Sequence, residues 1–416
     1  MGKFIELNSD LIKKSLSNIT QVTFEVTDAC NLKCKYCGYG EFYGDYDSRQ
    51  NRMLDINYAI KLLKYLNNLW SSNCNQSANR NVYISFYGGE PLMNMPFICK
   101  IVDYVNGMYS PHRTFTFSMT TNAMLLDKYM EYLVENDFNL LISLDGNEHN
   151  HSYRVDVNGN FSFERVMKNV DNLKNKYPFY FENKVNFNAV LHNRNSVDEI
   201  YNFIKCKYGK IPSIGELNNM GVKPEMREQF AKTYRNSYES LIQSENYENI
   251  EHDMFLRTPS SQEFATFIRQ HSGLNFRSYK DLLFERSNTP RMPTGTCIPF
   301  GKKIFVTVNG KILPCERIGH QFALGEIDSD GVKLDFEKIA QRYNGYFEKV
   351  KKQCSKCYDN NACIQCIFNL EDLEGKPVCH GFMNAKDFEK YKKQNLEYMQ
   401  QFPDDYYRVL REVEVE

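Results

Sequence analysis

The sequence predicts an α/β fold, in which a parallel sheet is covered by helices and is followed by a small cysteine-rich region. From residue 21 to residue 217, segments rich in β-branched and aromatic residues alternate with amphipathic stretches. This alternation is typical of β–α units in series, which right-handed crossovers wind into a barrel or an open doubly wound sheet. From Cys297 onward the composition changes, and seven of the thirteen cysteines fall there.

Six strands and five helices account for the first half of the chain. The expected strands are 21–27, 82–87, 114–120, 139–144, 185–191 and 213–217. The expected helices cover 55–69, 98–105, 126–136, 163–170 and 197–204. A helical insert is expected to follow, because residues 226–241 and 264–268 carry apolar side chains at helical spacing.

Composition limits the function classes. The chain has 416 residues and a net charge of −1, which excludes a global basic field for nucleic acid. We find no apolar stretch long enough to span a membrane and no apolar block of a signal peptide near Met1. We therefore expect a cytoplasmic protein without nucleic-acid or membrane partners. In that compartment the cysteines are expected to serve as metal ligands or catalytic groups.

Three cysteines follow the first expected strand at close spacing. Three residues separate Cys30 from Cys34, and two separate Cys34 from Cys37. Such a loop can place three thiolates on one iron–sulfur cube and leave one iron open to a small molecule. A zinc site is the alternative, but zinc takes four ligands and no nearby Cys or His follows Cys37.

The second group of cysteines begins around a predicted β-hairpin. Asn309-Gly310 lies between two β-rich runs, which predicts a type I′ turn that brings Cys297 and Cys315 towards the same end. The remaining cysteines of this group are Cys354, Cys357, Cys363, Cys366 and Cys379. Paired C-x2-C motifs also suit zinc ribbons, so zinc stays open as the metal.

The first triplet, with Tyr36 before its third cysteine, resembles the signature of radical S-adenosylmethionine enzymes. This resemblance implies a partial barrel of six β–α units of the TIM type, a 4Fe–4S cluster and bound S-adenosylmethionine. It also implies that the cofactor is contacted by residues at or after strand ends. These are Tyr36, Gly88, Gly89, Glu90, Asn122, Ser143, Arg154 and Leu191. Taken alone, Arg154 reads as an exposed loop residue and Leu191 as core.

The second group, with Gly310, is similar to the SPASM extension of peptide-modifying members of that family. The similarity implies two auxiliary 4Fe–4S clusters: an outer one on Cys354, Cys357, Cys363 and Cys379, and an inner one on Cys297, Cys315 and Cys366. The spacer between Cys363 and Cys366 is one residue shorter than the pattern. The expected segments are 1–215 (barrel), 216–294 (insert), 295–385 (auxiliary domain) and 386–416 (C-terminal helix).

The resemblance implies a peptide maturase that removes a hydrogen from a ribosomally made precursor peptide and forms a crosslink or thioether. A flavodoxin or ferredoxin would supply the electron. Few residues precede the first strand, so a separate leader-binding protein is a possible partner. Glu316 follows Cys315, where sulfatase-maturing relatives carry an acidic base, and is expected either to act as base or to be a charged loop residue. Sulfatase maturation and a non-catalytic zinc or iron–sulfur scaffold remain alternatives.

Overall fold

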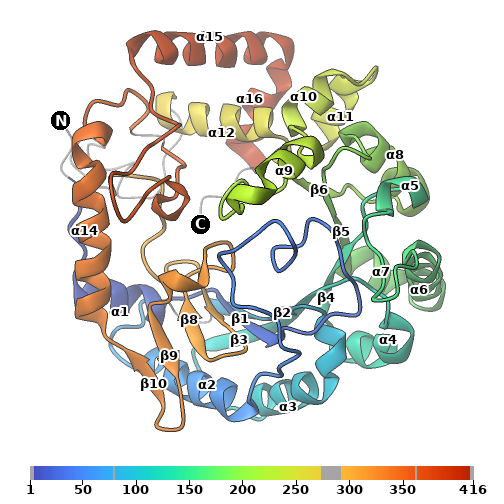
Figure 1. The fold of residues 1–416 in the computed structure, drawn as a ribbon. Coiled ribbons are helices and arrows are strands. Elements are labelled where there is room, and N and C mark those ends of the chain that lie inside the picture. The colour runs from blue at the N-terminus through green and yellow to red at the C-terminus, as the bar shows by residue number, and fades with distance from the viewer. Residues whose placement is uncertain (1–3, 78–79, 273–291, 361–362, 413–416) are drawn as a thin grey trace. The chain divides into compact units, whose positions relative to one another are not determined.

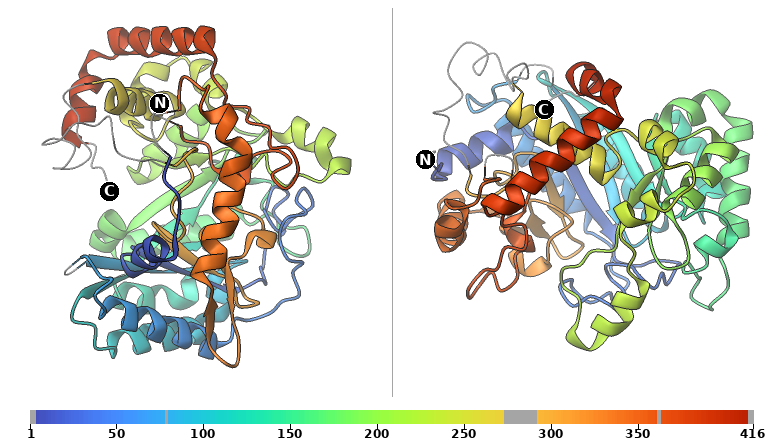
Figure 2. Two further views of the ribbon diagram at one scale, coloured as in Figure 1. Left: turned by 90° about the vertical axis from the view of Figure 1, so that its left-hand side faces the viewer. Right: turned by 90° about the horizontal axis from the view of Figure 1, so that it is seen from above.

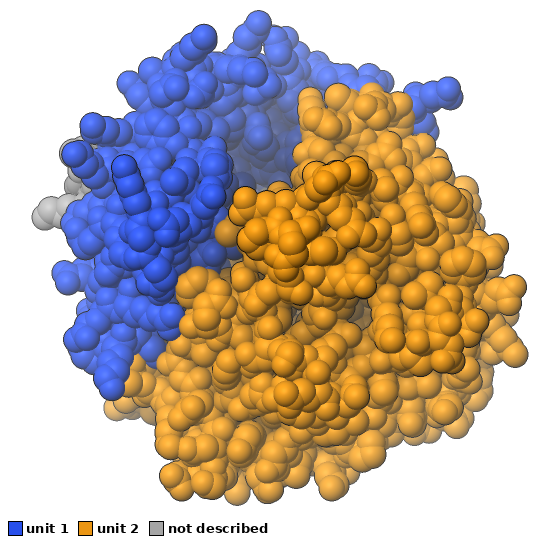
Figure 3. Space-filling model, viewed as in Figure 1, with its two compact units in different colours: residues 1–9, 245–297, 337–416 blue, residues 10–244, 298–336 orange. Residues whose placement is uncertain are grey.

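The chain forms two compact units in the computed structural model, which describes residues 4–77, 80–272, 292–360 and 363–412. The larger unit comprises Asp10–Ser244 and Ile298–Phe336, and the smaller one comprises Met1–Ser9, Glu245–Cys297 and Glu337–Glu416 (Figure 3). The expected auxiliary segment 295–385 is therefore divided between them: its hairpin belongs to the larger unit and its later cysteines to the smaller.

Six parallel strands form the centre of the larger unit, paired in their order along the chain. They are β1 (Gln21–Thr27), β2 (Arg80–Gly88), β3 (Arg113–Thr121), β4 (Asn139–Ser143), β5 (Val185–Val190) and β6 (Ser213–Gly215). Five longer helices connect them: α2 (Ile56–Trp70), α3 (Met95–Asn106), α4 (Leu126–Glu135), α6 (Phe163–Lys176) and α8 (Val197–Tyr208). The sheet curves with these helices on its outer side (Figure 1), which confirms the predicted partial barrel.

Alternation along β1 explains which face meets the helices. Val22, Phe24 and Val26 are fully buried, and the Phe24 ring meets Phe97 of α3 with centroids 6.2 Å apart. The intervening residues Gln21 and Thr23 line a cavity of about 320 Å³ on the opposite face of the sheet. Because successive side chains of a strand point to opposite faces, one face packs on helices and the other stays polar.

The expected hairpin is present, but its turn differs from the prediction. β7 (Lys303–Val306) and β8 (Lys311–Leu313) are antiparallel, and the Gly310 N–H donates to the Thr307 carbonyl at 2.8 Å. Only Gly310 of the Asn309-Gly310 pair has a positive φ, at 78°. The Thr307 N–H also donates to the Lys311 carbonyl, so the loop is a three-residue turn with Gly310 in the left-handed position rather than type I′.

The hairpin extends the barrel sheet, which the sequence did not predict. β7 pairs in parallel with β1, with Gln21 opposite Lys303 and Phe24 opposite Val306. β9 (Gly325–Ile327) and β10 (Val332–Leu334) continue beyond β8 and complete a ten-stranded sheet.

The stripe at 226–241 is interrupted rather than continuous. It divides into α9 (Arg227–Thr233) and α10 (Ser237–Ile242). Tyr234 is extended, and the Asn236 side chain accepts from the Glu239 N–H to cap α10 as a new helix. The shorter helices of the larger unit are α5 (Glu148–His151), α7 (Pro178–Lys184), η1 (Pro91–Asn94), η2 (Pro224–Met226) and η4 (His320–Phe322).

Helices dominate the smaller unit. They are α11 (Tyr247–Asp253), α12 (Pro259–His271), α14 (Phe336–Cys354, beginning in the larger unit), η5 (Ile367–Asn369), α15 (Ala385–Gln401) and α16 (Pro403–Glu412). α15 crosses α12 (Figure 2), and Phe264, Phe267, Tyr391 and Val409 form their shared core with α16. The expected single C-terminal helix is two helices, because Pro403 starts a new one.

Two further observations complete the fold. At the N-terminus, α1 (Ser9–Ser17) joins the two units along the chain. None of the helices described here is both long enough and apolar enough to span a bilayer.

Candidate active site

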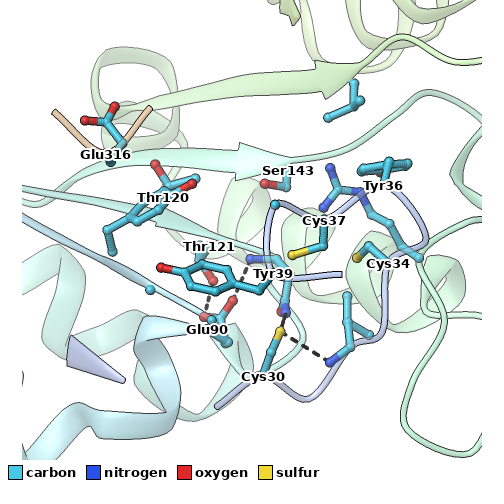
Figure 4. Close-up of a pocket in the computed structure, with 18 of the residues that line it drawn as sticks. Cys30, Cys34, Tyr36, Cys37, Tyr39, Glu90, Thr120, Thr121, Ser143 and Glu316 are labelled. Atoms are coloured by element: carbon cyan, nitrogen blue, oxygen red, sulfur yellow. Dashed lines mark hydrogen bonds between the residues drawn. The ribbon is translucent and has the colours of Figure 1, made fainter. Parts of the chain in front are cut away.

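The cysteine loop after β1 lines a cavity of about 240 Å³ in the larger unit (Figure 4). Cys30, Cys34 and Cys37 all reach it. The loop is held by its own turn, in which the Cys37 N–H donates to the Cys34 carbonyl at 3.1 Å, and by the neighbouring 153–155 segment, whose Val155 carbonyl accepts from the Lys33 N–H at 2.7 Å. Among the described residues, no three His, Cys, Asp or Glu side chains are grouped for one metal ion.

The thiols already have the donors that iron–sulfur ligands use. Cys30 Sγ accepts from the Leu32 N–H at 3.4 Å, and Cys37 Sγ accepts from Arg49 Nη2 at 3.2 Å. Burial raises the pKa of Cys30 to about 11 and that of Cys34 to about 12. A cationic metal centre reverses this effect, since thiolates are the binding form. The donor set therefore fits a cluster held by three thiolates.

The glycines after β2 are required by packing against the segment that leads into the cysteine loop. A Cβ on Gly89 would lie 2.0 Å from the Ala29 carbonyl oxygen, and one on Gly88 would lie 2.2 Å from that of Thr27. Gly88 also has a φ of 133°, which few side chains tolerate. These glycines thus bring the Glu90 turn against the end of β1, a tighter contact than the approach to a ligand expected from sequence.

Glu90 is buried at the end of this turn. Its Oε1 accepts from Thr121 Oγ1 at 2.7 Å and from the Leu92 N–H at 3.1 Å, while Oε2 accepts from the Asn122 N–H at 2.8 Å. Burial raises the pKa of Glu90 to about 7 in spite of these three bonds. A carboxyl group that lines a cavity and is costly to ionise is suited to a cationic partner such as an ammonium group.

Arg154 is buried rather than a surface loop residue, and Asp145 holds it. Its Nε and Nη2 donate to the two Asp145 carboxylate oxygens at 2.8 and 3.0 Å. Tyr36 also donates its hydroxyl to Asp145, and the Val190 N–H donates at 3.0 Å. Burial alone would raise the pKa of Asp145, but the Arg154 guanidinium brings it to about 2. The pair connects the cysteine loop to the ends of β4 and β5.

Of the other residues expected to contact the cofactor, some line the cavity and one does not. Asn122 and Ser143 both line the cavity, and Asn122 Nδ2 donates to Asn31 Oδ1 at 2.8 Å. Leu191 is fully buried and is not among the lining residues, whereas its neighbour Val190 is. The next residue along a strand faces the other side of a sheet, so one position decides which side chain reaches the cavity.

An aromatic loop follows the third cysteine. Phe42 and Tyr43 are buried against Phe230 of α9, while Tyr39 and Tyr46 line the cavity. The Tyr39 hydroxyl donates to Glu25, whose pKa burial raises to about 7. The loop is therefore packed against the protein at Phe42 and Tyr43 and faces the cavity at Tyr39 and Tyr46.

Glu316 lies at the other side of the cavity from the three cysteines (Figure 4). Both of its carboxylate oxygens accept from Lys303 Nζ at 3.1 Å. Burial acts to raise the pKa of Glu316, but Lys303 outweighs it and the pKa is lowered. The cation that pairs with Glu316 is therefore Lys303.

The later cysteines form two neighbourhoods in the smaller unit. Burial and the nearby Cys379 thiol raise the pKa of Cys363. Burial and the nearby Cys357 thiol raise the pKa of Cys379. Burial and the nearby Cys297 thiol raise the pKa of Cys366. The Ile367 N–H donates to Thr296 Oγ1 at 2.7 Å, which holds these two segments together. Cys354 contributes its carbonyl to the Cys357 N–H, and Cys315 belongs to the larger unit.

Sequence reasoning missed several residues at the site, among them Arg49, Asp145 and Tyr39. Asp145 stood in the Ser143-Leu144-Asp145-Gly146 motif, so its position after a strand was a usable signal. Arg49 and Tyr39 lie in an irregular loop, where no periodicity indicates which side chain turns inward.

Similarity to known proteins indicates the family to which these site residues are related. Residues 24–206 match the sequence model of the radical SAM superfamily. The chain contains a radical SAM domain. A 4Fe–4S cluster and S-adenosylmethionine are the cofactors that this family implies. The matched region includes the three cysteines, the Glu90 turn and the Asp145–Arg154 pair.

Related proteins include a cysteine-type anaerobic sulfatase-maturating enzyme of Clostridium perfringens, 25% identical over 88% of this chain and 94% of the relative. A second such enzyme, of Clostridium novyi, is 29% identical over 46% of this chain and 48% of its own length. A radical SAM cyclopropyl synthase, TigE of Paramaledivibacter caminithermalis, is 27% identical over 45% of this chain and 38% of its own length. The matches to the last two thus cover half or less of those relatives.

A solved structure has the same fold over most of this chain. It is the native anSMEcpe with bound AdoMet and Cp18Cys peptide, with a TM-score of 0.55 and 20% identity. The similarity covers 95% of this chain and 100% of that one.

Proposed function

We propose that this radical SAM enzyme is a peptide maturase that removes a hydrogen from a precursor peptide and forms a crosslink or thioether. The observation that carries the proposal is that a carboxylate, Glu316, lines the same cavity as the three cysteines of the loop. Peptide substrates are also suggested by a structural neighbour, since anSMEcpe was solved with a peptide bound.

The residues of the cavity divide the work of holding the cofactors. Cys30, Cys34 and Cys37 would ligate a 4Fe–4S cluster. Glu90 would accept from the amino group of S-adenosylmethionine. Arg154 would meet its carboxylate, because Asp145 takes only two of the five guanidinium N–H donors. When bound, the 4Fe–4S cluster and S-adenosylmethionine would supply a 5′-deoxyadenosyl radical for hydrogen abstraction, and auxiliary clusters would accept the electron that remains.

Further cofactor contacts come from Tyr36, Gly88, Gly89, Asn122 and Ser143. Val190 joins them on the evidence of its position in the cavity, and Leu191 supports it from the core. The proposed auxiliary ligands remain Cys354, Cys357, Cys363 and Cys379 for the outer cluster, and Cys297, Cys315 and Cys366 for the inner one. The proximity of Cys366 to Cys297 supports the second grouping in spite of the short spacer.

Glu316 would take the proton that the oxidised substrate releases. A thioether, or a crosslink through nitrogen or oxygen, requires a substrate S–H, N–H or O–H to lose its proton as the new bond forms, and a carboxylate at the cavity wall can accept it. Lys303 holds the carboxylate by two hydrogen bonds and so determines its orientation. Lys303 is accordingly a positioning residue.

Sulfatase maturation is the second candidate, in which a Cys or Ser of a partner protein would become formylglycine. The alignment over most of the C. perfringens enzyme favours it. The same carboxylate would serve as base in that reaction.

The test uses the full chain, reconstituted with iron and sulfide under anaerobic conditions. Wild type is given S-adenosylmethionine, a reductant and either a library of cysteine-containing peptides or a sulfatase-motif peptide. Loss of two hydrogens without a carbonyl supports the crosslink or thioether. An aldehyde trapped by a hydrazide supports formylglycine instead. If no peptide increases deoxyadenosine formation or changes mass, the peptide proposal is refuted.

The base is tested separately. Glu316→Gln is expected to lower product formation by about 100-fold or more while deoxyadenosine is still formed, and Glu316→Asp is expected to restore part of the activity. Equal product formation by Glu316→Gln and wild type would refute the role of Glu316.

A further inference from the structure

Three basic side chains gather on the surface of the cysteine loop. Lys33 and Lys35 flank Cys34, and Arg194 comes from the loop between β5 and α8. Lys35 Nζ lies 5.2 Å from the centre of the Tyr153 ring, and the Arg194 guanidinium carbon lies 3.9 Å from it. We call Lys33, Lys35 and Arg194 the basic cluster.

The backbone beneath the basic cluster is held firmly. The Lys33 N–H donates to the Val155 carbonyl at 2.7 Å, and the Lys35 N–H to the Tyr153 carbonyl at 3.4 Å. Arg194 Nη1 donates to Ser152 Oγ at 2.8 Å. The charges are therefore presented from a defined surface.

No carboxylate of the described chain forms an ion pair with any residue of the basic cluster. The nearest along the paired segment, Asp156, accepts instead from the Asn158 and Asn160 N–H groups of its own turn, at 2.8 and 2.9 Å. Like charges repel one another, and no ion pair offsets that repulsion within the basic cluster. It is suited to an anionic partner.

An exposed apolar edge adjoins the basic cluster. Val155 and Phe161 form a β-bridge that makes a short hairpin beside the cysteine loop. Phe161 is 64% exposed and Val157 is 53% exposed. A group of basic side chains next to a small exposed apolar area is typical of transient protein interfaces whose partners are attracted by charge.

We propose that the basic cluster docks a small acidic one-electron carrier protein of the flavodoxin or ferredoxin class. A radical SAM enzyme needs an electron from outside, and electron transfer slows steeply with distance. The donor must therefore approach the loop that carries the cysteines, and Cys34 stands between two lysines of the basic cluster. The proposal rests on radical SAM activity alone and not on the peptide substrate.

The test compares two reductants on one variant. Lys33→Glu, Lys35→Glu and Arg194→Glu are combined in the reconstituted full chain, and deoxyadenosine formation is measured without peptide. An acidic flavodoxin kept reduced by its reductase drives one series, and titanium(III) citrate drives the other. The flavodoxin-driven rate is expected to fall about tenfold or more, because steering is lost, while the citrate-driven rate stays unchanged. Lys64→Glu with Lys100→Glu, both exposed on α2 and α3, is the matched control.

A binding measurement gives a readout that does not depend on turnover. Oxidised flavodoxin is titrated into each protein by calorimetry at low and at high salt. Wild type is expected to bind more weakly at high salt, and the triple variant to bind weakly at both. Lys33→Glu alone, at an exposed position, replaces the triple variant if that variant fails to fold.

The outcomes are distinct. Equal loss with both reductants, or no loss with either, overturns the docking site. Wild type that forms no deoxyadenosine with titanium(III) citrate overturns the cofactor assignment of the proposed function as well.

Discussion

Asp145→Asn should destabilise the larger unit by about 3 kcal/mol. The fall in the Asp145 pKa from 3.8 to about 2 corresponds to about 2.5 kcal/mol of preference for the charged form. Asparagine would also leave the Arg154 charge buried without its partner, and breaking a buried pair in this way costs about 3–5 kcal/mol. Because the folded pKa lies below the unfolded one, this contribution is present above about pH 4 and is lost as pH falls through about 2.

The chain supplies its own probe for this measurement. Trp70, the single tryptophan, is buried in α2 of the larger unit, so its fluorescence in urea reports the unfolding of that unit. The matched control is Asp137→Asn, which breaks an exposed pair with Lys184 and should cost about 1 kcal/mol or less. If the two variants unfold at the same urea concentration at pH 7, the Asp145–Arg154 pair does not anchor the site and the reasoning fails.

Three further predictions concern the cofactor side of the cavity. Because a raised pKa leaves Glu90 protonated below about pH 7, the increase in melting temperature caused by S-adenosylmethionine should be larger at pH 8 than at pH 6; an equal increase would exclude Glu90 as the ammonium partner. Gly89→Ala should reduce the iron retained after reconstitution, since its Cβ would lie 2.0 Å from a carbonyl oxygen, whereas Gly107→Ala at the end of α3 should retain it. Arg49→Met should shift the reduction potential of the cluster to more negative values in a redox titration, because it removes a charged donor 3.2 Å from Cys37 Sγ; an unchanged potential would contradict this contact.

Local patterns were sufficient to predict most elements of the barrel. β1 was predicted at its observed bounds because the segment is rich in β-branched and aromatic residues, and the start of α8 was predicted at Val197. The turn at Asn309-Gly310 was predicted as a hairpin but with the wrong geometry, because loop length and register are decided by the strands it joins.

Partners that are distant in the chain were beyond local reasoning. Nothing near Tyr36 in sequence indicates that its hydroxyl bonds to Asp145, or that Lys303 will face Glu316. The choice between Val190 and Leu191 depends on a register of one residue, which a sequence pattern does not resolve where both side chains are apolar. The cysteine motifs themselves were informative because their spacing is set by cluster chemistry rather than by packing.

The pairing of β7 with β1 affects how the protein folds during its synthesis on the ribosome. Gln21 and Lys303 are paired in the sheet. The residues that precede them, Thr20 and Lys302, are hydrogen-bonded although they lie 282 positions apart in the chain. During synthesis the edge of β1 therefore stays unpaired until most of the chain has emerged. An open strand edge invites intermolecular pairing. We expect translation products that stop before β7 to aggregate, and chaperones that protect exposed edges to increase the yield of the full-length enzyme.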